Sequence, residues 1–207
     1  MSLWGDAHAA STNKPKFLPQ DENSDYNRAD CYATQAGWVM QAGHPSSGNG
    51  NTSATPEVLV ASGGLAGATD TTGLRAPTVT SMRFVKGTTA TTDLTAANST
   101  ARVRVEITWD EEITVAGTPQ VVLANSNASG GGYGTYTLSY ISAGSTANRK
   151  LFQATSQSLG NTDVLTLGGT NIALNSGTIS DTVRGGTAQA ASLVLSGLSA
   201  VAVTIAS

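Results

Sequence analysis

Apolar and polar residues alternate most clearly in the segment TARVRVEITWD, residues 100–110. Successive side chains of an extended strand point to opposite sides, so every second residue shares a face. One face of this segment is apolar and the other is polar: Val103, Val105, Ile107 and Trp109 against Arg102, Arg104, Glu106 and Thr108. The pattern predicts a half-buried β-strand whose last inward residue is Trp109.

Other segments after residue 76 are also strand-like in sequence and are separated by Gly, Asn, Asp and Pro. They cover residues 77–87, 118–125, 134–141, 163–169, 170–177 and 192–206. In 134–141 the alternation points Tyr136, Leu138 and Tyr140 inward. Because Thr and Val at this density favour strand over helix, we expect an antiparallel β-sandwich of about seven strands with immunoglobulin-like architecture.

Residues 1–75 differ from the rest, because they contain little periodicity and many turn residues. Two short apolar segments, 36–43 and 56–63, predict strands joined as a hairpin by the Gly-, Ser- and Asn-rich stretch between them. A region so poor in core residues needs a neighbour to offset its ordering entropy. We therefore predict two domains, a loop-rich N-terminal anchoring module (1–75) with short strands and an immunoglobulin-like β-sandwich (76–207).

Composition excludes several functional classes. The formal charge is −3 and the pI about 5.2, which gives no electrostatic footprint for nucleic acid or for an anionic membrane. The single Cys31 has no cysteine partner for a disulfide or a zinc cluster. The first residues lack the apolar run of a secretion signal, so we expect a soluble protein that is made in a cytoplasm.

Three consecutive acids, Asp110, Glu111 and Glu112, stand between two runs of β-forming residues. They could form a calcium site or a carboxylate pair, or a solvated corner between two strands. The sequence favours the solvated corner, because this half has no second acidic cluster and Asp163 and Asp181 stand alone. A second acidic stretch, DENSDYNRAD (21–30), lacks the turn Gly and the terminal Glu of a calcium loop, and it too is expected to be a solvated loop.

The chain has few histidines that could serve in catalysis or metal binding. His8 and His44 are the only histidines, both lie in loop-like sequence, and neither has the spacing of a metal motif. We therefore expect no catalytic, metal-binding or cofactor-binding residues, and a protein that is not an enzyme.

The stretch from Val103 to Asp181 contains TWDEEITVAGTPQVVL, GTYTLSYI and ALNSGTISD in that order. These pieces resemble the pattern of a bacterial and phage immunoglobulin-like repeat family over about 80 residues. The resemblance implies a sandwich used for adhesion, decoration or spacing, with no catalytic residues to carry over.

The N-terminal pieces MSLWG, KPKFL, AGWV and EVLVA form a second resemblance. They are similar to the start of virion structural proteins from contractile-tailed phages of marine cyanobacteria. The resemblance implies a virion protein, most simply a capsid decoration protein, that is assembled in the host cytoplasm and bound to the major capsid protein or other virion subunits in many copies.

Docking on the particle is expected to use the aromatic and strand residues of the N-terminal module. These are Trp4, Trp38, Val58, Leu59 and Val60, and the strand could add to an open sheet edge. Trp4 and Trp38 could instead complete a small core. The alternatives are a neck or tail protein with the same anchor, and a host-adhesion module in which Tyr133 and Trp109 stack on the sugar rings of a surface glycan.

Overall fold

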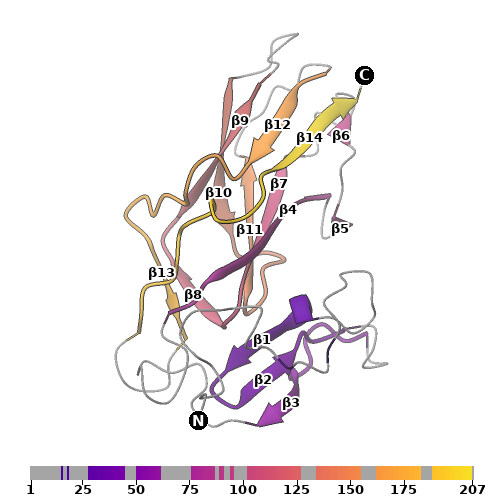
Figure 1. Cartoon of the computed structure of the whole chain (residues 1–207), viewed down its shortest axis with the longest axis vertical. Coiled ribbons are helices and arrows are strands. Elements are labelled where there is room, and N and C mark those ends of the chain that lie inside the picture. Colours follow the sequence, from indigo (N-terminus) through magenta and orange to yellow (C-terminus); the bar gives the residue numbers. More distant parts are fainter. Residues whose placement is uncertain are drawn as a thin grey trace. The chain divides into compact units, whose positions relative to one another are not determined.

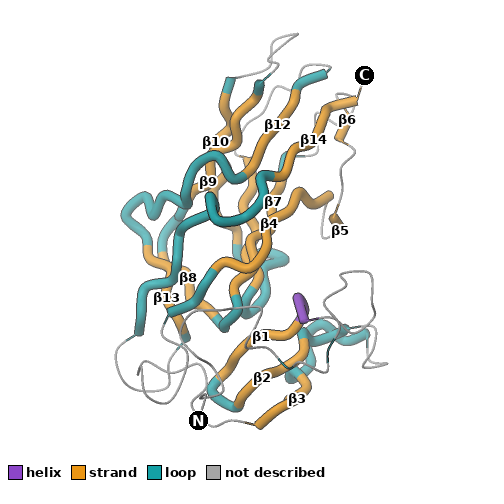
Figure 2. Tube along the Cα trace, viewed as in Figure 1, coloured by secondary structure: helices purple, strands orange, loops and turns teal. Residues whose placement is uncertain are grey.

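The computed structural model describes residues 15, 18, 28–44, 50–61, 76–86, 89–90, 94–95, 102–126, 134–154, 162–182 and 188–206. Apart from one 3-10 helix, η1 (Arg28–Asp30), the regular structure of these residues consists of β-strands (Figure 2). The prediction of a mainly β fold built from antiparallel strands is confirmed, and the arrangement is consistent with a β-sandwich-like fold.

The chain forms two compact units. Unit 1 comprises Met1–Thr80, Trp109–Thr114 and Ile179–Ser192, and unit 2 comprises Ser81–Thr108, Val115–Thr178 and Leu193–Ser207. The predicted division after residue 75 is a single cut along the chain, whereas unit 1 also takes in two segments from the later part of the sequence. These two segments carry the acidic run and Asp181.

Unit 1 contains a three-stranded antiparallel sheet in the order β1-β2-β3 (indigo to purple in Figure 1). Its strands are β1 (Cys31–Thr34), β2 (Gly37–Met40) and β3 (Glu57–Ala61). Strands β2 and β3 lie within the two segments predicted for this region and pair as the expected hairpin. Strand β1 was missed, because CYAT follows an acidic, turn-rich stretch that hides its strand signal.

A tight turn joins β1 to β2. Ala36 donates its backbone N–H to the Thr34 hydroxyl at 3.2 Å, and that hydroxyl donates to the Gly37 carbonyl at 3.1 Å. Gly37 has a φ of 128°, which is open to glycine but costly for other residues. The turn sets the register in which Ala33 faces Trp38 and Cys31 faces Met40.

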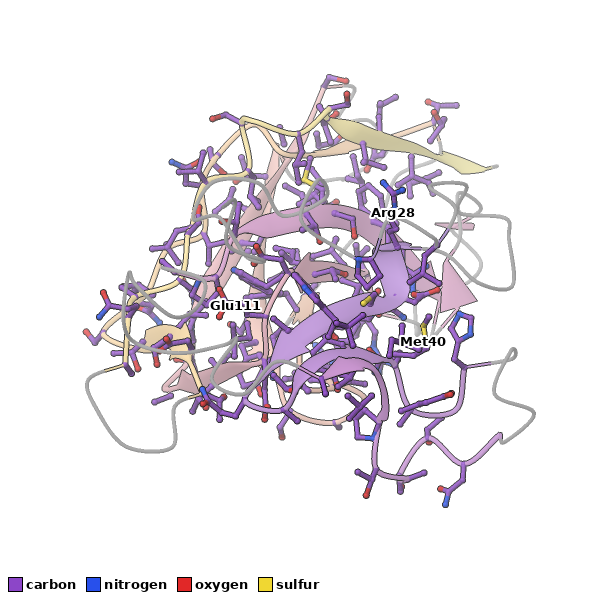
Figure 3. All side chains as sticks on the ribbon, turned by 60° about the horizontal axis from the view of Figure 1, so that its bottom comes forward. Arg28, Met40 and Glu111 are labelled. Atoms are coloured by element: carbon purple, nitrogen blue, oxygen red, sulfur yellow. The ribbon has the colours of Figure 1, made fainter. Side chains whose placement is uncertain are left out.

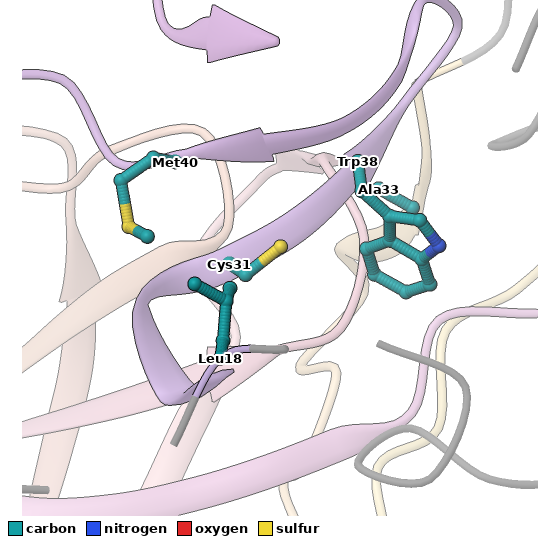
Figure 4. Packing of buried hydrophobic residues seen from close by; sticks show 5 residues of the cluster. All are labelled: Leu18, Cys31, Ala33, Trp38 and Met40. Carbon is teal, nitrogen blue, oxygen red and sulfur yellow. The ribbon is translucent and has the colours of Figure 1, made fainter. Parts of the chain in front are cut away.

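A hydrophobic cluster of unit 1, called the core cluster below, lies on one face of this sheet. Among the described residues its buried side chains, against which Leu59 and Val60 pack, are Leu18, Cys31, Ala33, Trp38 and Met40 (Figure 4). The strand period explains the membership, because alternate residues of β1 and β2 share a face. The opposite face is covered as well, since Tyr32 and Val39 are each only 2% exposed.

Most remaining strands belong to a nine-stranded sheet in the order β5-β4-β7-β11-β10-β9-β12-β14-β6. Their bounds are β4 (Val79–Lys86), β5 (Thr89–Ala90), β6 (Leu94–Thr95), β7 (Arg104–Trp109), β9 (Gln120–Asn125), β10 (Thr135–Ile141), β11 (Arg149–Ala154), β12 (Val164–Leu167) and β14 (Val201–Ala206). Strands β8 (Ile113–Ala116) and β13 (Thr178–Asp181) form a separate pair.

Five of the predicted segments contain the strands β4, β7, β9, β10 and β12. Segment 192–206 holds only β14 at its end, and segment 170–177 contributes a single bridge between Ala173 and Gln120. Strand β11 was not predicted, because its residues RKLFQA lack regular alternation. In this strand Lys150 is buried beside Leu151 and Phe152, so a charged side chain occupies a position that the pattern assigns to solvent.

The expectation that β7 is half buried is wrong, because both faces of the strand are largely covered. The predicted inward residues Val103, Val105, Ile107 and Trp109 have no exposed surface, as expected. However, Glu106 on the other face is only 8% exposed. It is buried because Arg83 binds its carboxylate at 2.8 Å and Arg149 lies 4.0 Å away. An ion pair can cover a face that the sequence pattern assigns to solvent.

Strand β10 follows its predicted alternation at Tyr136 and Leu138, which are buried. Tyr140 is only partly buried, and its ring meets Phe152 of β11 edge to face with centroids 6.2 Å apart. Such a pair adds about 0.5–1.5 kcal/mol beyond the area that it buries.

Candidate functional site

The acidic run lies where the sequence places it, between the end of β7 at Trp109 and the start of β8 at Ile113. The expectation that it forms a solvated corner is wrong. Asp110 is 3% exposed and Glu111 has no exposed surface. These two carboxyl groups are therefore shielded from water, and unit 1 must stabilise them in some other way.

The backbone of the acidic run is bound to the edge of β1. The Ala33 N–H donates to the Asp110 carbonyl at 2.8 Å, and the Glu112 N–H donates to the Ala33 carbonyl at 3.0 Å. Glu111 and Ala33 thereby form a parallel β-bridge. The run is therefore joined to the edge of β1 by an isolated bridge at one residue, Glu111.

Two more segments of unit 1 hold the run in place. The Asp110 carboxylate accepts the Thr78 N–H at 2.6 Å, while the Asp110 N–H donates to the Thr78 carbonyl at 3.1 Å. On the other side, Thr182 donates its N–H to the Glu112 carbonyl at 3.1 Å. A carboxylate that accepts a backbone N–H is well stabilised, which explains how Asp110 tolerates burial.

Glu111 is accommodated differently. Neither of its carboxyl oxygens has a hydrogen-bond partner among the described residues. Burial, followed by the neighbouring Asp110 and Asp181, raises the pKa of Glu111 from 4.5 to about 9. At neutral pH this side chain is therefore a neutral acid, because the charged form would be buried without a partner. Figure 3 shows the Glu111 side chain beside the three-stranded sheet of unit 1.

Asp181 was expected to stand alone, and the tertiary structure corrects this. It is 2% exposed in unit 1 and contributes to the electrostatic environment of Glu111. One of its oxygens accepts the Gln189 N–H at 2.7 Å, and the other has no partner among the described residues. Burial raises the pKa of Asp181, although the Gln189 bond opposes the shift. No local pattern indicates this proximity, because 70 residues separate Glu111 from Asp181.

The calcium interpretation gains no support from the described residues, which include no group of three or more His, Cys, Asp or Glu side chains suited to holding a metal ion. Most of the second acidic stretch, residues 21–27, lies outside the described residues. Its last residue, Asp30, ends η1.

His44 and Asp30 form a hydrogen-bonded pair of titratable side chains in unit 1. His44 is 6% exposed, and its Nε2 lies 3.0 Å from the Asp30 carboxylate. The adjacent Cys31 is buried in the core of unit 1, with no exposed surface. The pair joins η1 to the loop after β2, and His8 lies outside the described residues.

The predicted partner-binding residues fall in three different environments. Val58 is 47% exposed, whereas Leu59 and Val60 are partly buried against the core cluster. Trp38 has no exposed surface, so of the two roles left open for it, its side chain takes the one in the core. Its indole N–H has no partner among the described residues. Trp4 lies outside the described residues.

Strand β3 stands at one end of the three-stranded sheet. Its pairing with β2 is irregular, because Trp38 faces Val60 while Val39 faces Val58, which leaves Leu59 as an extra residue. A bulge of this kind breaks the regular hydrogen-bond spacing of an edge strand and disfavours the addition of another strand. The edge therefore presents a side chain, Val58, more readily than a hydrogen-bonding ladder.

A role for Trp109 in stacking on sugars is contradicted by its burial. The ring has no exposed surface, and its indole N–H donates to the Ser192 carbonyl at 3.1 Å. Trp109 is thus a core residue, as the sequence pattern also indicated. Tyr133, the other proposed stacking residue, lies outside the described residues.

Comparison of the chain with models of protein families, with curated proteins and with solved structures returned no match. Among the described residues, no helix has the length and apolar character needed to cross a membrane.

Proposed function

We propose that the chain is a structural protein of a tailed-phage particle. In this proposal it decorates the capsid, docks on the major shell protein through its N-terminal module and projects an immunoglobulin-like domain. The two sequence resemblances supply the class of particle. The observation that carries the docking surface is the exposed valine on strand β3.

Val58 is suited to a contact because its strand neighbours hold it firmly. Leu59 and Val60 pack against the core cluster, so Val58 is presented on a supported strand while remaining 47% exposed. Covering the exposed part of one valine contributes about 1 kcal/mol. A single contact of this size is weak, but a shell offers many equivalent sites.

Decoration then works through mass action. A protein that binds only the assembled shell stabilises it, because the binding free energy is absent from the dissociated state. Contacts shared between neighbouring shell subunits add to the effect by raising the effective concentration of the second contact. The bulge at Leu59 favours side-chain docking over strand addition as the form of the contact.

The test is co-sedimentation of the recombinant chain with empty shells. We expect wild-type protein to sediment with the shells and to raise their thermal midpoint. The substitution Val58→Asp should abolish both effects. Val194→Asp is the matched control, because Val194 is 50% exposed but lies in unit 2. Equal binding by both variants, or no binding by the wild type, would exclude the proposed surface.

Copy number separates the capsid from the neck and tail. Mass spectrometry of purified virions should give on the order of hundreds of copies for a shell protein, against roughly six or twelve for a closed ring.

A further inference from the structure

The Glu111 carboxyl is the least satisfied polar group of the acidic run. Its side chain has no exposed surface, and neither oxygen has a hydrogen-bond partner among the described residues. Burying an ionised carboxylate without a partner is far more costly than burying the neutral acid. The protonation state of this one group therefore has a large effect on whether its segment can stay in place.

The backbone explains why the carboxyl cannot turn away to solvent. Glu111 lies opposite Ala33 in a parallel bridge that two hydrogen bonds close. Residues opposite one another in a bridge project to the same side of a sheet. Because Ala33 in turn faces Trp38, the Glu111 side chain projects to the face that carries the core cluster. Moving it to water requires the segment to leave β1.

Asp110 and Asp181 oppose the ionisation of Glu111, and the other titratable groups described nearby offer no positive charge to favour it. Asp110 precedes it, and Asp181 approaches from β13. From β1, Cys31 shares the face of Ala33, while Tyr32 and Glu112 interact on the other face. None of these five groups is a cation that could pair with an ionised Glu111.

We propose that Glu111 is a proton-controlled latch between the acidic run 110–112 and strand β1. As a neutral acid it lies under the sheet and the run stays hydrogen-bonded to Ala33. When it loses its proton, the run parts from β1 and the edge of that strand opens.

The raised pKa of Glu111, about 9, is consistent with this geometry and gives the pH range. The latch is closed at neutral pH and opens as the pH rises through this value. One pH unit on either side changes the ratio of ionised to neutral groups about tenfold.

Cys31 is a suitable probe, because it is the only cysteine of the chain and its side chain is buried on the face that the latch closes. The experiment measures the rate at which a thiol reagent labels Cys31 in the full chain. Rates are divided by those of a short peptide with the same sequence, which removes the pH dependence of the thiol itself. Far-UV circular dichroism follows the global fold in the same samples.

Between about pH 8 and about pH 10, the normalised rate of the wild type should rise roughly tenfold while the dichroism is unchanged. Glu111→Gln should remain flat, because its amide cannot ionise. Glu57→Gln is the matched control, since Glu57 is an exposed carboxyl on β3, and it should follow the wild type. Asp181→Asn should shift the rise to lower pH, because it removes a neighbouring negative charge.

Three results would overturn the latch. The first is the same pH profile in Glu111→Gln and the wild type. The second is a loss of dichroism together with the rise in labelling, which would mean global unfolding. The third is a rise that occurs in EDTA but is absent in millimolar calcium chloride at every pH, which would mean that the acidic run is a cation site.

Discussion

Raising the pH from about 5 to about 8 should lower the free energy of unfolding, and Glu111→Gln should remove most of that loss. The sign follows from proton linkage. The pKa of Glu111 lies above its ordinary value in the folded protein, so the folded state binds a proton that the unfolded state has released. The stabilisation is fully present below the unfolded pKa of 4.5 and is lost as the pH rises toward the folded value of about 9.

The magnitude follows from the same two values. Each pH unit between them changes the free energy of unfolding by about 1.4 kcal/mol, so the interval from about pH 5 to about pH 8 corresponds to about 4 kcal/mol. Burial also raises the pKa of Asp181 and, against the opposing effect of Arg83, that of Glu106. Ionisation of these two groups also lowers the free energy of unfolding as the pH rises. The Glu111→Gln variant should therefore keep a smaller pH dependence of its stability.

Urea unfolding at several pH values, followed by tryptophan fluorescence, measures the effect. The wild type should unfold at progressively lower urea concentration as the pH rises from about 5 to about 8. The Glu111→Gln variant should show a clearly flatter dependence, and Glu57→Gln should match the wild type. A wild-type protein that gains stability over this interval, or a variant that keeps the wild-type slope, would refute the burial of a neutral Glu111.

Two further substitutions test the packing of strands and core. Gly177→Ala should destabilise the protein by about 1–3 kcal/mol in urea unfolding. The added Cβ would meet the Ala116 carbonyl oxygen and lie 3.0 Å from the Leu174 carbonyl oxygen. The control Gly197→Ala should be nearly neutral, because its Cβ would have no neighbouring atom within 4 Å. Trp109→Phe should cost about 2–3 kcal/mol, because it removes the bond to the Ser192 carbonyl as well as buried area. A thermal midpoint that is unchanged in Trp109→Phe would contradict the core role of this residue.

Much of the strand content could be predicted because it depends on local pattern. Alternation identified the inward face of β7 and most of that of β10, and turn residues marked the hairpin of β2 and β3. Strands β1 and β11 could not be predicted from alternation. Both have both faces largely covered, so a strict alternation of apolar and polar residues is not required of them.

The candidate site was predictable only in part. Position along the chain placed the acidic run between two strands. Val58 lies exposed on an edge strand, and its role in partner binding stays a prediction. Burial of Asp110 and Glu111 was not predictable, because their cover comes from β1 and from the segment around Asp181. Both covering segments are distant in sequence.

By itself, the sequence determined what depends on neighbouring residues: strand periodicity, turn positions, the scarcity of charge and the single thiol. Only the tertiary structure decided which acids are solvated and which are buried. Burial depends on which distant backbone supplies the next hydrogen bonds, and a parallel bridge between Ala33 and Glu111 leaves no local signal. The same tripeptide, Asp-Glu-Glu, can therefore form a solvent-exposed turn in one tertiary context and contain a buried, protonated glutamic acid in another.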